Sequence, residues 1–387
     1  MIEILEELNP WWKNKFNSDS ISRPKYLDLL IKELTTKNVT ILTGIRRVGK
    51  TTLMKQLISH LLGGKINPKN ILFLSLDLLY FNNYSIYDIV LEYKKIHKIS
   101  NSEKVYLFLD EITYKKSFNQ ELKNLYDLGN YVIFASSSSA KVLKDNKAFL
   151  TGRSRYFEVF PLDFKEYLLF NNYTLEKTDF HILVSLFDEY MEFGGMPEYV
   201  LNKDQIYLSE LLELIISKDI ISAHNIRNTT VVYDLFKLLC ERVGKQISYN
   251  KLSKILEVDN ETVSRYVSYF LDTYLFDLVE VKGKLNERIK GSKKLYCIDV
   301  GLRNIVTGFR DKGAVYENLV FNKIKKFSPN FFYKNGIEID FCFGDTLIEA
   351  KYGQEMNKEQ RKLFDNSHFK QKIVAQGVEF FINDGIN

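Results

Sequence analysis

A glycine-rich segment followed by lysine and threonine is the first place where residue types and spacing suggest chemistry. It reads Gly44, Ile45, Arg46, Arg47, Val48, Gly49, Lys50, Thr51 and Thr52. In this pattern backbone N–H groups surround an anion, the lysine reaches the β- and γ-phosphates of a nucleotide, and the first threonine hydroxyl ligates Mg²⁺. We therefore expect ATP and Mg²⁺ to bind here. The alternative is an ordinary glycine-rich turn.

The residues on either side of this segment favour the nucleotide site. The apolar run VTILT at 39–43 precedes it, and the helical pattern TLMKQLISHLL at 52–62 follows it. The loop therefore lies where a strand ends and a helix begins. The free N–H groups and the dipole of a helix N-terminus attract an anion.

Two adjacent carboxylates, Asp110 and Glu111, end a second apolar run at 105–109. A carboxylate at the tip of a buried strand suits the Mg²⁺ shell, and the next one can polarise the attacking water. We therefore expect Lys50, Asp110 and Glu111 to support ATP hydrolysis. The alternative is two acids that begin a helix, where negative charge is favourable.

Hydroxyl and guanidinium groups follow the later strands. Four serines at 136–139 lie where a γ-phosphate sensor is expected, although serine runs are more often plain loops. Arg153, like nearby Arg155, is a candidate for a cation that completes the site of a neighbouring subunit in a homo-oligomer. The alternative is a solvated surface arginine.

A second group of acids lies near the C-terminus. If residues 337–343 and 346–350 form a hairpin around a glycine turn, Asp340 and Glu349 converge, and Lys351 lies on the same strand face as Glu349. Two carboxylates and a lysine can hold Mg²⁺ and a water for phosphodiester hydrolysis, and Glu317 can supply a third acid. The alternative is a set of stabilising charge pairs on an exposed strand.

Composition sets the broad class. The 387 residues exceed what one ordinary core supports, so two or three domains are expected, and 45% hydrophobic residues indicate a globular chain. A net charge of +5 is too small to identify a nucleic-acid partner. Three distant cysteines predict neither disulfides nor a zinc site and fit the cytoplasm. We recognise no export signal and no membrane span.

Hydrophobic patterns divide the chain into an N-terminal arm and four domains. Residues 1–20 form the arm, whose Trp11 and Trp12 should pack onto the first domain. Alternating apolar runs and helical patterns at 21–162 predict an α/β fold with a parallel sheet. Its strands are expected at 39–43, 71–77, 105–110, 132–136 and 156–159.

The remaining patterns predict three smaller domains. Residues 163–228 read as a helical lid interrupted by a turn at Gly194 and Gly195. Residues 229–290 read as a winged helix-turn-helix, with helices at 249–256 and 261–272 and a strand at 276–281. Residues 291–387 read as a small α/β domain with helices at 315–326 and 358–365 and strands at 331–333, 337–343, 346–350, 372–375 and 378–382.

A cluster of basic residues suggests a DNA partner. The segment expected as the wing contains Lys282, Lys284, Arg288, Lys290, Lys293 and Lys294. Such a ribbon suits contacts with phosphates. The exposed side of the helix expected at 261–272 has only one arginine, Arg265, and one arginine offers few contacts for recognising bases. The alternative is a packing or dimerisation module.

Several motifs together resemble a known family. They are GIRRVGKTTL, Asp110-Glu111-Ile112, Gly152-Arg153, Phe160-Pro161-Leu162, Gly194-Gly195-Met196-Pro197-Glu198, Asp299-Val300-Gly301-Leu302 and Glu317-Asn318. In these the chain resembles the prokaryotic AAA-type ATPases that carry the domain of unknown function 4143. The resemblance implies an AAA+ core, a winged helix and a C-terminal domain similar to the PD-(D/E)xK nucleases. The chain departs from that pattern at the serine run and at Thr113, so the sensor residue stays open.

These features lead to one main hypothesis and one alternative. The main hypothesis is an ATPase that couples Mg²⁺-dependent ATP hydrolysis to DNA binding, with DNA cleavage left open. The alternative is an ATP-dependent regulatory switch that binds a protein partner and has an inactive nuclease-like domain.

Overall fold

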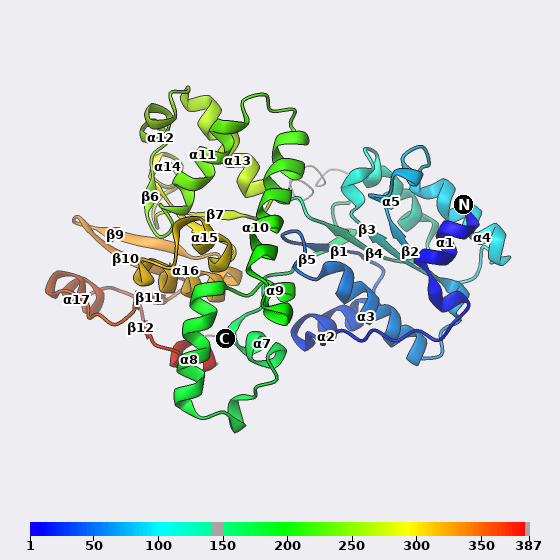
Figure 1. The fold of residues 1–387 in the computed structure, drawn as a ribbon, viewed down its shortest axis with the longest axis horizontal. Helices are drawn as coiled ribbons and strands as arrows, with labels where there is room; N and C mark the ends of the chain where they lie inside the picture. The colour runs from blue at the N-terminus through cyan, green and yellow to red at the C-terminus, as the bar shows by residue number, and fades with distance from the viewer. Residues whose placement is uncertain (141–149, 384–387) are drawn as a thin grey trace. The chain divides into compact units, whose positions relative to one another are not determined.

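A five-stranded parallel sheet forms the centre of the first of two compact units, Met1–Phe160 (Figure 1). The structure is a computed structural model and describes residues 1–140 and 150–383. The strands pair in the order β2-β3-β4-β1-β5. They are β1 (Val39–Thr43), β2 (Ile71–Ser75), β3 (Val105–Asp110), β4 (Tyr131–Ser137) and β5 (Ser154–Glu158). The α/β class and the parallel sheet expected from the sequence are therefore confirmed.

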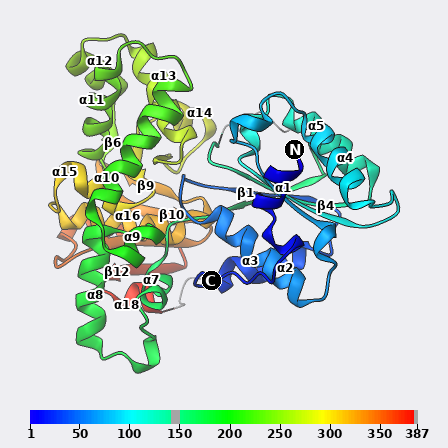
Figure 2. The same ribbon diagram turned by 45° about the vertical axis from the view of Figure 1, so that its right-hand side comes forward.

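Helices cover both faces of this sheet (Figure 2). One face carries α2 (Pro24–Glu33) and α3 (Lys50–Gly63), and the other carries α1 (Ile2–Leu8), α4 (Ile86–His97) and α5 (Phe118–Leu128). Strands β1 and β3 are buried along their whole length. Burial on both faces explains why these strands read as continuous apolar runs without alternation.

The N-terminal arm is held by the edge strand β2. The side chain of Asn9 bonds to both backbone groups of Phe73, donating to its oxygen at 3.0 Å and accepting from its nitrogen at 2.6 Å. The indole nitrogens of Trp11 and Trp12 donate to the oxygen of Ile71 at 3.2 and 2.9 Å. The arm thus occupies hydrogen-bonding positions along the sheet edge, and the expected packing of the tryptophans is confirmed.

The second unit, Pro161–Asn387, begins with the helices that we expected to form a lid. They are α7 (Phe164–Phe170), α8 (Phe180–Phe193), α9 (Pro197–Asn202), α10 (Gln205–Leu214) and the π-helix Ile215–Ser222. Phe187 of α8 packs against Tyr316 and Phe381, with ring centroids 6.1 and 4.8 Å away. Because these rings share one aromatic cluster, the segment belongs to the core of the second unit.

A buried carboxylate holds the turn between α8 and α9. Asp299 accepts hydrogen bonds from the backbone nitrogens of Gly195 at 2.7 Å and Leu302 at 3.1 Å. Gly194 has φ +74, and a Cβ atom there would lie 2.3 Å from the Asp299 carboxylate. Burial raises the pKa of Asp299 to about 6. Two of the motifs noted in the sequence therefore contact each other and stabilise the fold.

Three helices and a small antiparallel sheet follow. The helices are α11 (Thr229–Cys240), α12 (Tyr249–Leu256) and α13 (Asn260–Asp272), and the sheet has the order β6-β8-β7. Its strands are β6 (Gln246–Ile247), β7 (Phe276–Val279) and β8 (Lys293–Cys297). Asp259 caps α13 by accepting from the backbone nitrogen of Thr262 at 2.8 Å. Because β8 pairs with β7, this sheet extends past residue 290, where we expected it to end.

The segment expected as a basic ribbon differs from the expectation. Between β7 and β8 the chain forms a short helix, α14 (Leu285–Lys290). This helix exposes the apolar side chains of Leu285 and Ile289 along with its basic residues. The segment between β7 and β8 is therefore not the basic ribbon that the sequence suggested, because exposed apolar side chains lie among its basic ones.

A mixed four-stranded sheet ends the chain, with the order β12-β11-β10-β9. It comprises β9 (Asn330–Lys334), β10 (Ile337–Phe343), β11 (Thr346–Lys351) and β12 (Gln371–Gln376), together with α15 (Val300–Thr307), α16 (Lys312–Ile324), α17 (Lys358–Asp365) and α18 (Glu379–Ile382). The strand expected at 378–382 is wrong, because Gly377 turns the chain with φ +60 and α18 follows. Phe381 then enters the aromatic cluster around Tyr316.

A β-bulge in β10 changes the direction of its side chains. The pairing of β10 with β9 shifts register between Ile339 and Cys342. Both residues lie in the core with Phe364 of α17, although residues three apart in a regular strand face opposite sides. On its other edge β10 forms the expected antiparallel hairpin with β11, and Phe341 pairs with Ile348. The next positions along the two strands are Asp340 and Glu349.

No helix formed by residues 1–140 and 150–383 is long and apolar enough to cross a membrane.

Candidate nucleotide site and acidic pocket

The glycine-rich loop joins β1 to α3 and has a backbone that only glycine fits well. Gly44 has φ +138, and a Cβ atom there would lie 2.3 Å from the backbone oxygen of Val159. Gly49 has φ +102 immediately before α3 begins. The loop therefore curves closely around the N-terminus of a 14-residue helix, where unpaired N–H groups can receive an anion.

Lys50 and Thr51, the first two residues of α3, lie close to the acidic end of β3. The ammonium group of Lys50 donates to the backbone oxygens of Gly44 at 2.9 Å and Ile45 at 3.1 Å. It also lies 4.0 Å from a carboxylate oxygen of Glu111. The hydroxyl of Thr51 donates to Oδ2 of Asp110 at 2.7 Å. The fold thus brings these four predicted site residues together with the loop.

Two serines of the run after β4 contact the two carboxylates. The hydroxyl of Ser136 donates to Asp110 and accepts from the backbone nitrogen of Glu111 at 2.9 Å. The hydroxyl of Ser138 donates to Glu111 at 3.0 Å. Ser137 instead accepts from the backbone nitrogen of Ser139. Ser136 and Ser138 therefore contact the two carboxylates, whereas Ser137 bonds within its own loop.

Glu111 has a strained backbone. Its φ of +53 lies in the left-handed region, which side-chain-bearing residues adopt rarely and at a cost of about 1 to 3 kcal/mol. The backbone N–H of Glu111 donates to the hydroxyl of Ser136, and its carboxylate accepts from the hydroxyl of Ser138, so both ends of the residue are held in this conformation. Strain that is maintained in this way is typical of functional positions.

Arg23 contacts the loop although no motif predicts it. Its guanidinium group donates to the backbone oxygens of Val48 at 3.1 Å and Phe160 at 2.9 Å, and only 3% of the residue is exposed. It thereby ties the segment before α2 to the glycine-rich loop. A lone arginine before a proline carries no sequence signal for such a role.

Arg153 lies apart from the other predicted site residues. It directly precedes β5, and β1 and β5 run parallel, with Val39 opposite Ser154. Arg153 is therefore at the amino end of the sheet, whereas the glycine-rich loop is at the carboxyl end. Its side chain lies 3.6 Å from Asp127. A role in the site of a second copy of the chain stays a prediction.

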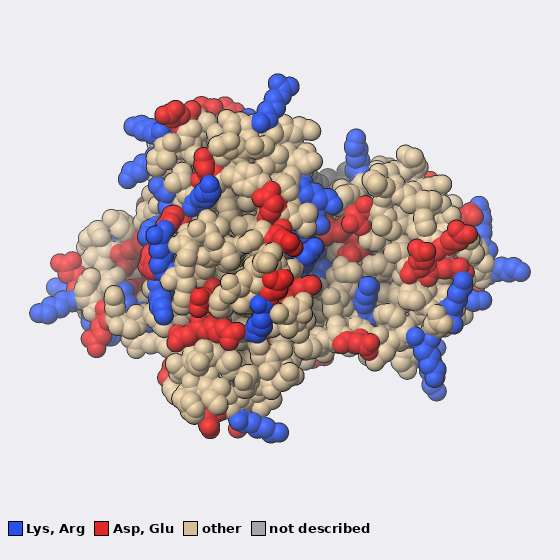
Figure 3. Space-filling model, viewed as in Figure 1, with Lys and Arg blue, Asp and Glu red and all other residues tan. Residues whose placement is uncertain are grey.

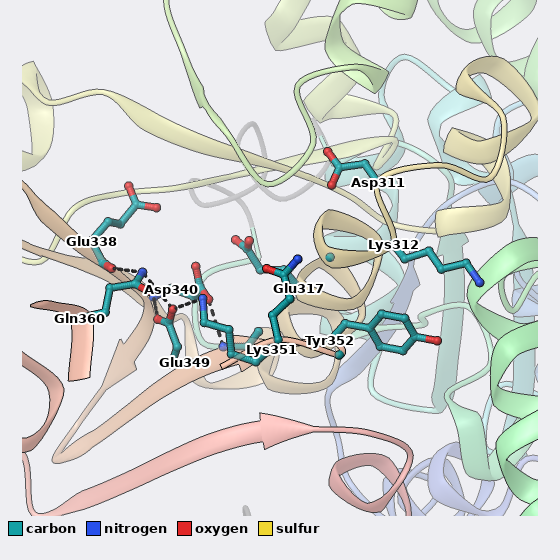
Figure 4. A pocket seen from close by; sticks show the side chains of 13 residues that line it. Asp311, Lys312, Glu317, Glu338, Asp340, Glu349, Lys351, Tyr352 and Gln360 are labelled. Carbon is teal, nitrogen blue, oxygen red and sulfur yellow. Dashed lines mark hydrogen bonds and ion pairs between the residues drawn. The ribbon is translucent and has the colours of Figure 1, made fainter. Parts of the chain in front are cut away.

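The second predicted site lies in a pocket of about 600 Å³ in the C-terminal part of the second unit (Figure 4). Its polar lining includes Glu317 from α16, Glu338 and Asp340 from β10, Glu349 and Lys351 from β11, and Gln360 from α17. The structure therefore brings together the four residues expected here and adds two that sequence reasoning missed.

The hairpin carboxylates are held by hydrogen bonds across β10 and β11. Oε2 of Glu349 accepts from the backbone nitrogen of Asp340 at 3.1 Å, and Oδ2 of Asp340 accepts from that of Ala350 at 3.0 Å. Oε1 of Glu349 lies 2.8 Å from the ammonium group of Lys351 and 3.2 Å from the amide nitrogen of Gln360. Figure 4 shows these side chains next to one another, with dashed lines that mark the contacts among them.

The structure contradicts our assignment of Lys294 to an exposed wing. It is 1% exposed, and its ammonium nitrogen lies 2.7 Å from Glu317, 2.8 Å from Glu338 and 3.2 Å from Asp340. Alternation along β8 explains the error, because Lys293 turns to Glu280 and the next side chain must point to the opposite face. A charge count along the sequence cannot show which face of a strand is buried.

The acidic pocket has fewer positive than negative groups. Burial, and then the charge of Asp340, raises the pKa of Glu317 to about 7 and that of Glu349 to about 8. Burial would lower the pKa of Lys294, but its carboxylate neighbours, Glu317 foremost, outweigh this effect and raise it. Among the described residues, no group of three or more His, Cys, Asp or Glu is arranged to hold a metal ion.

The comparisons with known proteins identify the first unit. Residues 36–168 match the family model of an AAA domain. An uncharacterized protein of Methanocaldococcus jannaschii, MJ1544, is 32% identical over 365 residues, which cover 86% of this chain and 79% of the relative. The chain belongs to the same family as this protein. Its first unit is therefore an AAA-type P-loop ATPase domain that binds ATP.

Other matches extend beyond the AAA domain. An uncharacterized protein of Haemophilus influenzae is 27% identical over 380 residues, which cover 92% of the AAA-type chain and 93% of the relative. A solved structure, the Walker-type ATPase PABY2304 of Pyrococcus abyssi, has 15% identity and a TM-score of 0.49, covering 77% of this chain and 99% of that chain.

One part of the expected resemblance is wrong. Residues 184–313 match a domain of unknown function designated DUF8612, not the domain of unknown function 4143. The match runs from α8 to the start of α16 and includes Lys294. It ends before Glu317, so four acids of the pocket lie outside it, while Asp311, which also lines the pocket, lies inside it.

Proposed function

We propose that the first unit hydrolyses ATP with Mg²⁺. The observation that carries this proposal is the 2.7 Å contact between the Thr51 hydroxyl and the Asp110 carboxylate. A hydroxyl and a carboxylate at one point, beside a helix N-terminus, form the oxygen donor set that Mg²⁺ prefers next to nucleotide phosphates. The residues present therefore fit the ion. Bound Mg²⁺ would supply positive charge for the phosphate oxygens.

The remaining groups have roles that follow from their positions. The N–H groups of the loop and of α3 receive the phosphates. Lys50 exchanges the carbonyls of Gly44 and Ile45 for phosphate oxygens, which are stronger acceptors because they are charged. Glu111 takes a proton from the attacking water, and Ser138 keeps that carboxylate in place.

Paired substitutions test this proposal. We expect Lys50→Ala and Asp110→Asn each to lower kcat for ATP about a hundredfold or more, because each removes charge stabilisation at the phosphates. Lys55→Ala, on the exposed side of the same helix, is the matched control and should retain activity. Full turnover by the Lys50→Ala variant would refute the assignment.

For the second unit we propose contact with DNA phosphates. The order of α11, β6, α12, α13, β7 and β8 is that of a winged helix, which is a common DNA-binding fold. The available charge is smaller than the sequence suggested, because Lys294 is buried and Arg288 and Lys293 pair with Glu280. The lysines of this segment that remain for contacts with DNA phosphates are Lys282, Lys284 and Lys290. Figure 3 shows basic and acidic residues interspersed on the face in view.

Lys294 favours a second candidate function, a regulatory switch that binds a partner and does not cut DNA. Glu317, Asp340, Glu349 and Lys351 have the chemistry of a PD-(D/E)xK nuclease site, but oxygens of two of these acids are paired with Lys294. The pocket as it stands does not fit a metal ion, so we derive no cleavage step. Incubation of DNA with the protein, Mn²⁺ and ATP tests the nuclease: cleavage that Asp340→Asn abolishes identifies a nuclease, and the absence of cleavage excludes it and leaves the switch as the candidate.

A further inference from the structure

Two large apolar side chains are exposed on α14, the short helix between β7 and β8. Leu285 is 66% exposed and Ile289 is 64% exposed. Residues four apart lie on the same face of a helix, so these two side chains form one apolar ridge. A single exposed apolar residue needs no explanation, but two neighbours on a helix of six residues make its outer face apolar.

Glu287 and two glycines fold α14 into a compact tip. The carboxylate of Glu287 accepts from the backbone nitrogen of Lys284 at 2.9 Å, and a Cβ atom at Gly283 would lie 2.2 Å from that carboxylate. At the other end, the backbone nitrogen of Gly291 donates to the backbone oxygen of Glu287 at 2.7 Å. A Cβ atom at Gly291 would lie 2.5 Å from this oxygen. The chain can therefore turn this closely at both ends of the helix because glycines stand there.

The base of the tip is fixed to neighbouring strands. The backbone nitrogen of Lys282 donates to the oxygen of Phe331 at 2.8 Å, and the nitrogen of Phe331 donates to the oxygen of Glu280 at 3.0 Å. The side chain of Glu280 pairs with Arg288 at 2.8 Å and with Lys293 at 3.1 Å. A ridge that is held at its base loses little conformational freedom on binding, which favours a role in recognition.

Basic residues surround the apolar ridge. Lys284 directly precedes Leu285 in the sequence, and it is exposed. Lys290 directly follows Ile289 and is exposed as well. Residues 280–293 contain two acids and five basic residues, which are Lys282, Lys284, Arg288, Lys290 and Lys293. The resulting net charge of +3 is complementary to a polyanion.

We propose that α14 is a wedge that enters the minor groove of duplex DNA, where Leu285 and Ile289 unstack base pairs and the flanking lysines contact phosphates. Proteins that bend DNA from the minor groove insert apolar side chains in this way, and the bent duplex then covers more protein surface. The inference rests on the proposal that the second unit contacts DNA phosphates. It adds how that contact would select DNA.

Selection by a wedge depends on how easily a base-pair step kinks, and pyrimidine–purine steps such as TA kink most easily. This mode suits a winged helix with little capacity to recognise bases directly. Its helix α13 has one basic residue, Arg265. A wedge therefore provides a preference among DNA sequences that α13 does not need to supply.

A membrane surface matches the same ridge less well. Helices that lie on membranes bury a broad apolar face, and their binding grows with the apolar area that is buried. α14 exposes two apolar side chains, and the acidic Glu287 lies between them in the sequence. Two such side chains are enough to unstack a base-pair step, because the wedges of DNA-bending proteins are single side chains.

The test compares binding and bending of DNA by the full chain. The probe is a duplex of about 30 base pairs with central TA steps and a fluorescence donor and acceptor at its two ends. We expect the unmodified chain to bring the ends closer and raise the energy transfer. The double variant Leu285→Ala, Ile289→Ala should leave the bound duplex straight and bind it about tenfold more weakly. Its slope of log affinity against log salt should stay unchanged, because no phosphate contact is removed.

The matched control is Ile206→Ala on α10, which removes a side chain that is 67% exposed in the same unit. This variant should bind and bend DNA as the unmodified chain does. All three side chains are exposed, so we expect equal thermal unfolding of the variants and the unmodified chain.

Three results would overturn the wedge. Binding by the unmodified chain without bending, or equal bending by the double variant, would refute it and leave the proposed phosphate contact standing. Binding of anionic lipid vesicles that only the double variant loses, with equal DNA binding by both chains, would assign the ridge to a membrane. If the unmodified chain binds no duplex at low salt, the phosphate contact itself is refuted and the wedge with it.

Discussion

Oγ of Ser138 lies 3.0 Å from Oε2 of Glu111, and Oγ of Ser136 donates to the neighbouring Asp110. Two hydroxyls two positions apart therefore hold two consecutive carboxylates of the adjacent strand. The arrangement assigns a different partner to each serine of a run that looks uniform in the sequence.

Ser138→Ala should lower kcat for ATP about tenfold while the Kd for ATP changes little. The hydroxyl contacts the proposed base, and general-base catalysis contributes roughly a hundredfold or more when the base is well placed. Ser137→Ala is the comparator, because that hydroxyl bonds to the backbone of Ser139 in its own loop. Steady-state kinetics and a fluorescent-nucleotide titration measure the two quantities. Equal kinetics of both variants would contradict the assignment.

Asp299 should make the second unit less stable as pH rises. Burial raises its pKa from 3.8 to about 6 in the folded chain. Its contribution is therefore present in full below pH 4 and is lost as pH rises through 6, a change of about 3 kcal/mol. Burial also raises the pKa values of the neighbouring Tyr190 and Cys297, so both stay neutral in this range.

The measurement compares the unfolding free energies of the unmodified chain and Asp299→Asn from pH 4 to 7. Asparagine cannot titrate, so the advantage of the unmodified chain should shrink as pH rises. A difference that does not depend on pH would show that this carboxyl is already ionised throughout.

Asn318→Leu should destabilise the second unit by about 2 to 4 kcal/mol. The substitution removes both hydrogen bonds to Cys297 and leaves a buried backbone N–H and C=O unpaired. Trp11 and Trp12, the two tryptophans of the chain, both lie in the first unit. Denaturation followed by tryptophan fluorescence should therefore be unchanged, while circular dichroism shows an earlier transition. An earlier tryptophan transition would mean that the two units unfold together.

Charge changes near α14 should alter DNA binding in opposite directions. Replacing Lys284 and Lys290 with alanine should weaken binding and reduce the slope of log affinity against log salt by about 1.8, from two lost phosphate contacts. Glu280→Gln should strengthen binding because it releases Arg288 and Lys293. Fluorescence anisotropy at several salt concentrations measures both effects, and Lys370→Ala is the surface control. Unchanged salt slopes would place any DNA contact elsewhere.

Local sequence patterns predicted most of the elements. The bounds expected for the strands at 39–43 and 105–110 and for the helices at 249–256 and 358–365 are those of the structure. These elements are short and bounded by clear signals, such as the glycine-rich loop after β1 and the cap Asn357 before α17. The error at 378–382 arose because an apolar run of five residues suits a strand or a helix equally well.

The sequence by itself determined the nucleotide site, because its loop, lysine and threonine are contiguous and its acids end one apolar strand. For the acidic pocket the sequence indicated Glu317, Asp340, Glu349 and Lys351, and only the tertiary structure added the cation that pairs with these acids and the further carboxylate beside it. Lys294 and Glu338 carry no motif, and their role depends on which face of β8 is buried and how β10 bulges beside Asp340. Contacts between distant strands follow from packing, whereas adjacent residues act through local backbone geometry.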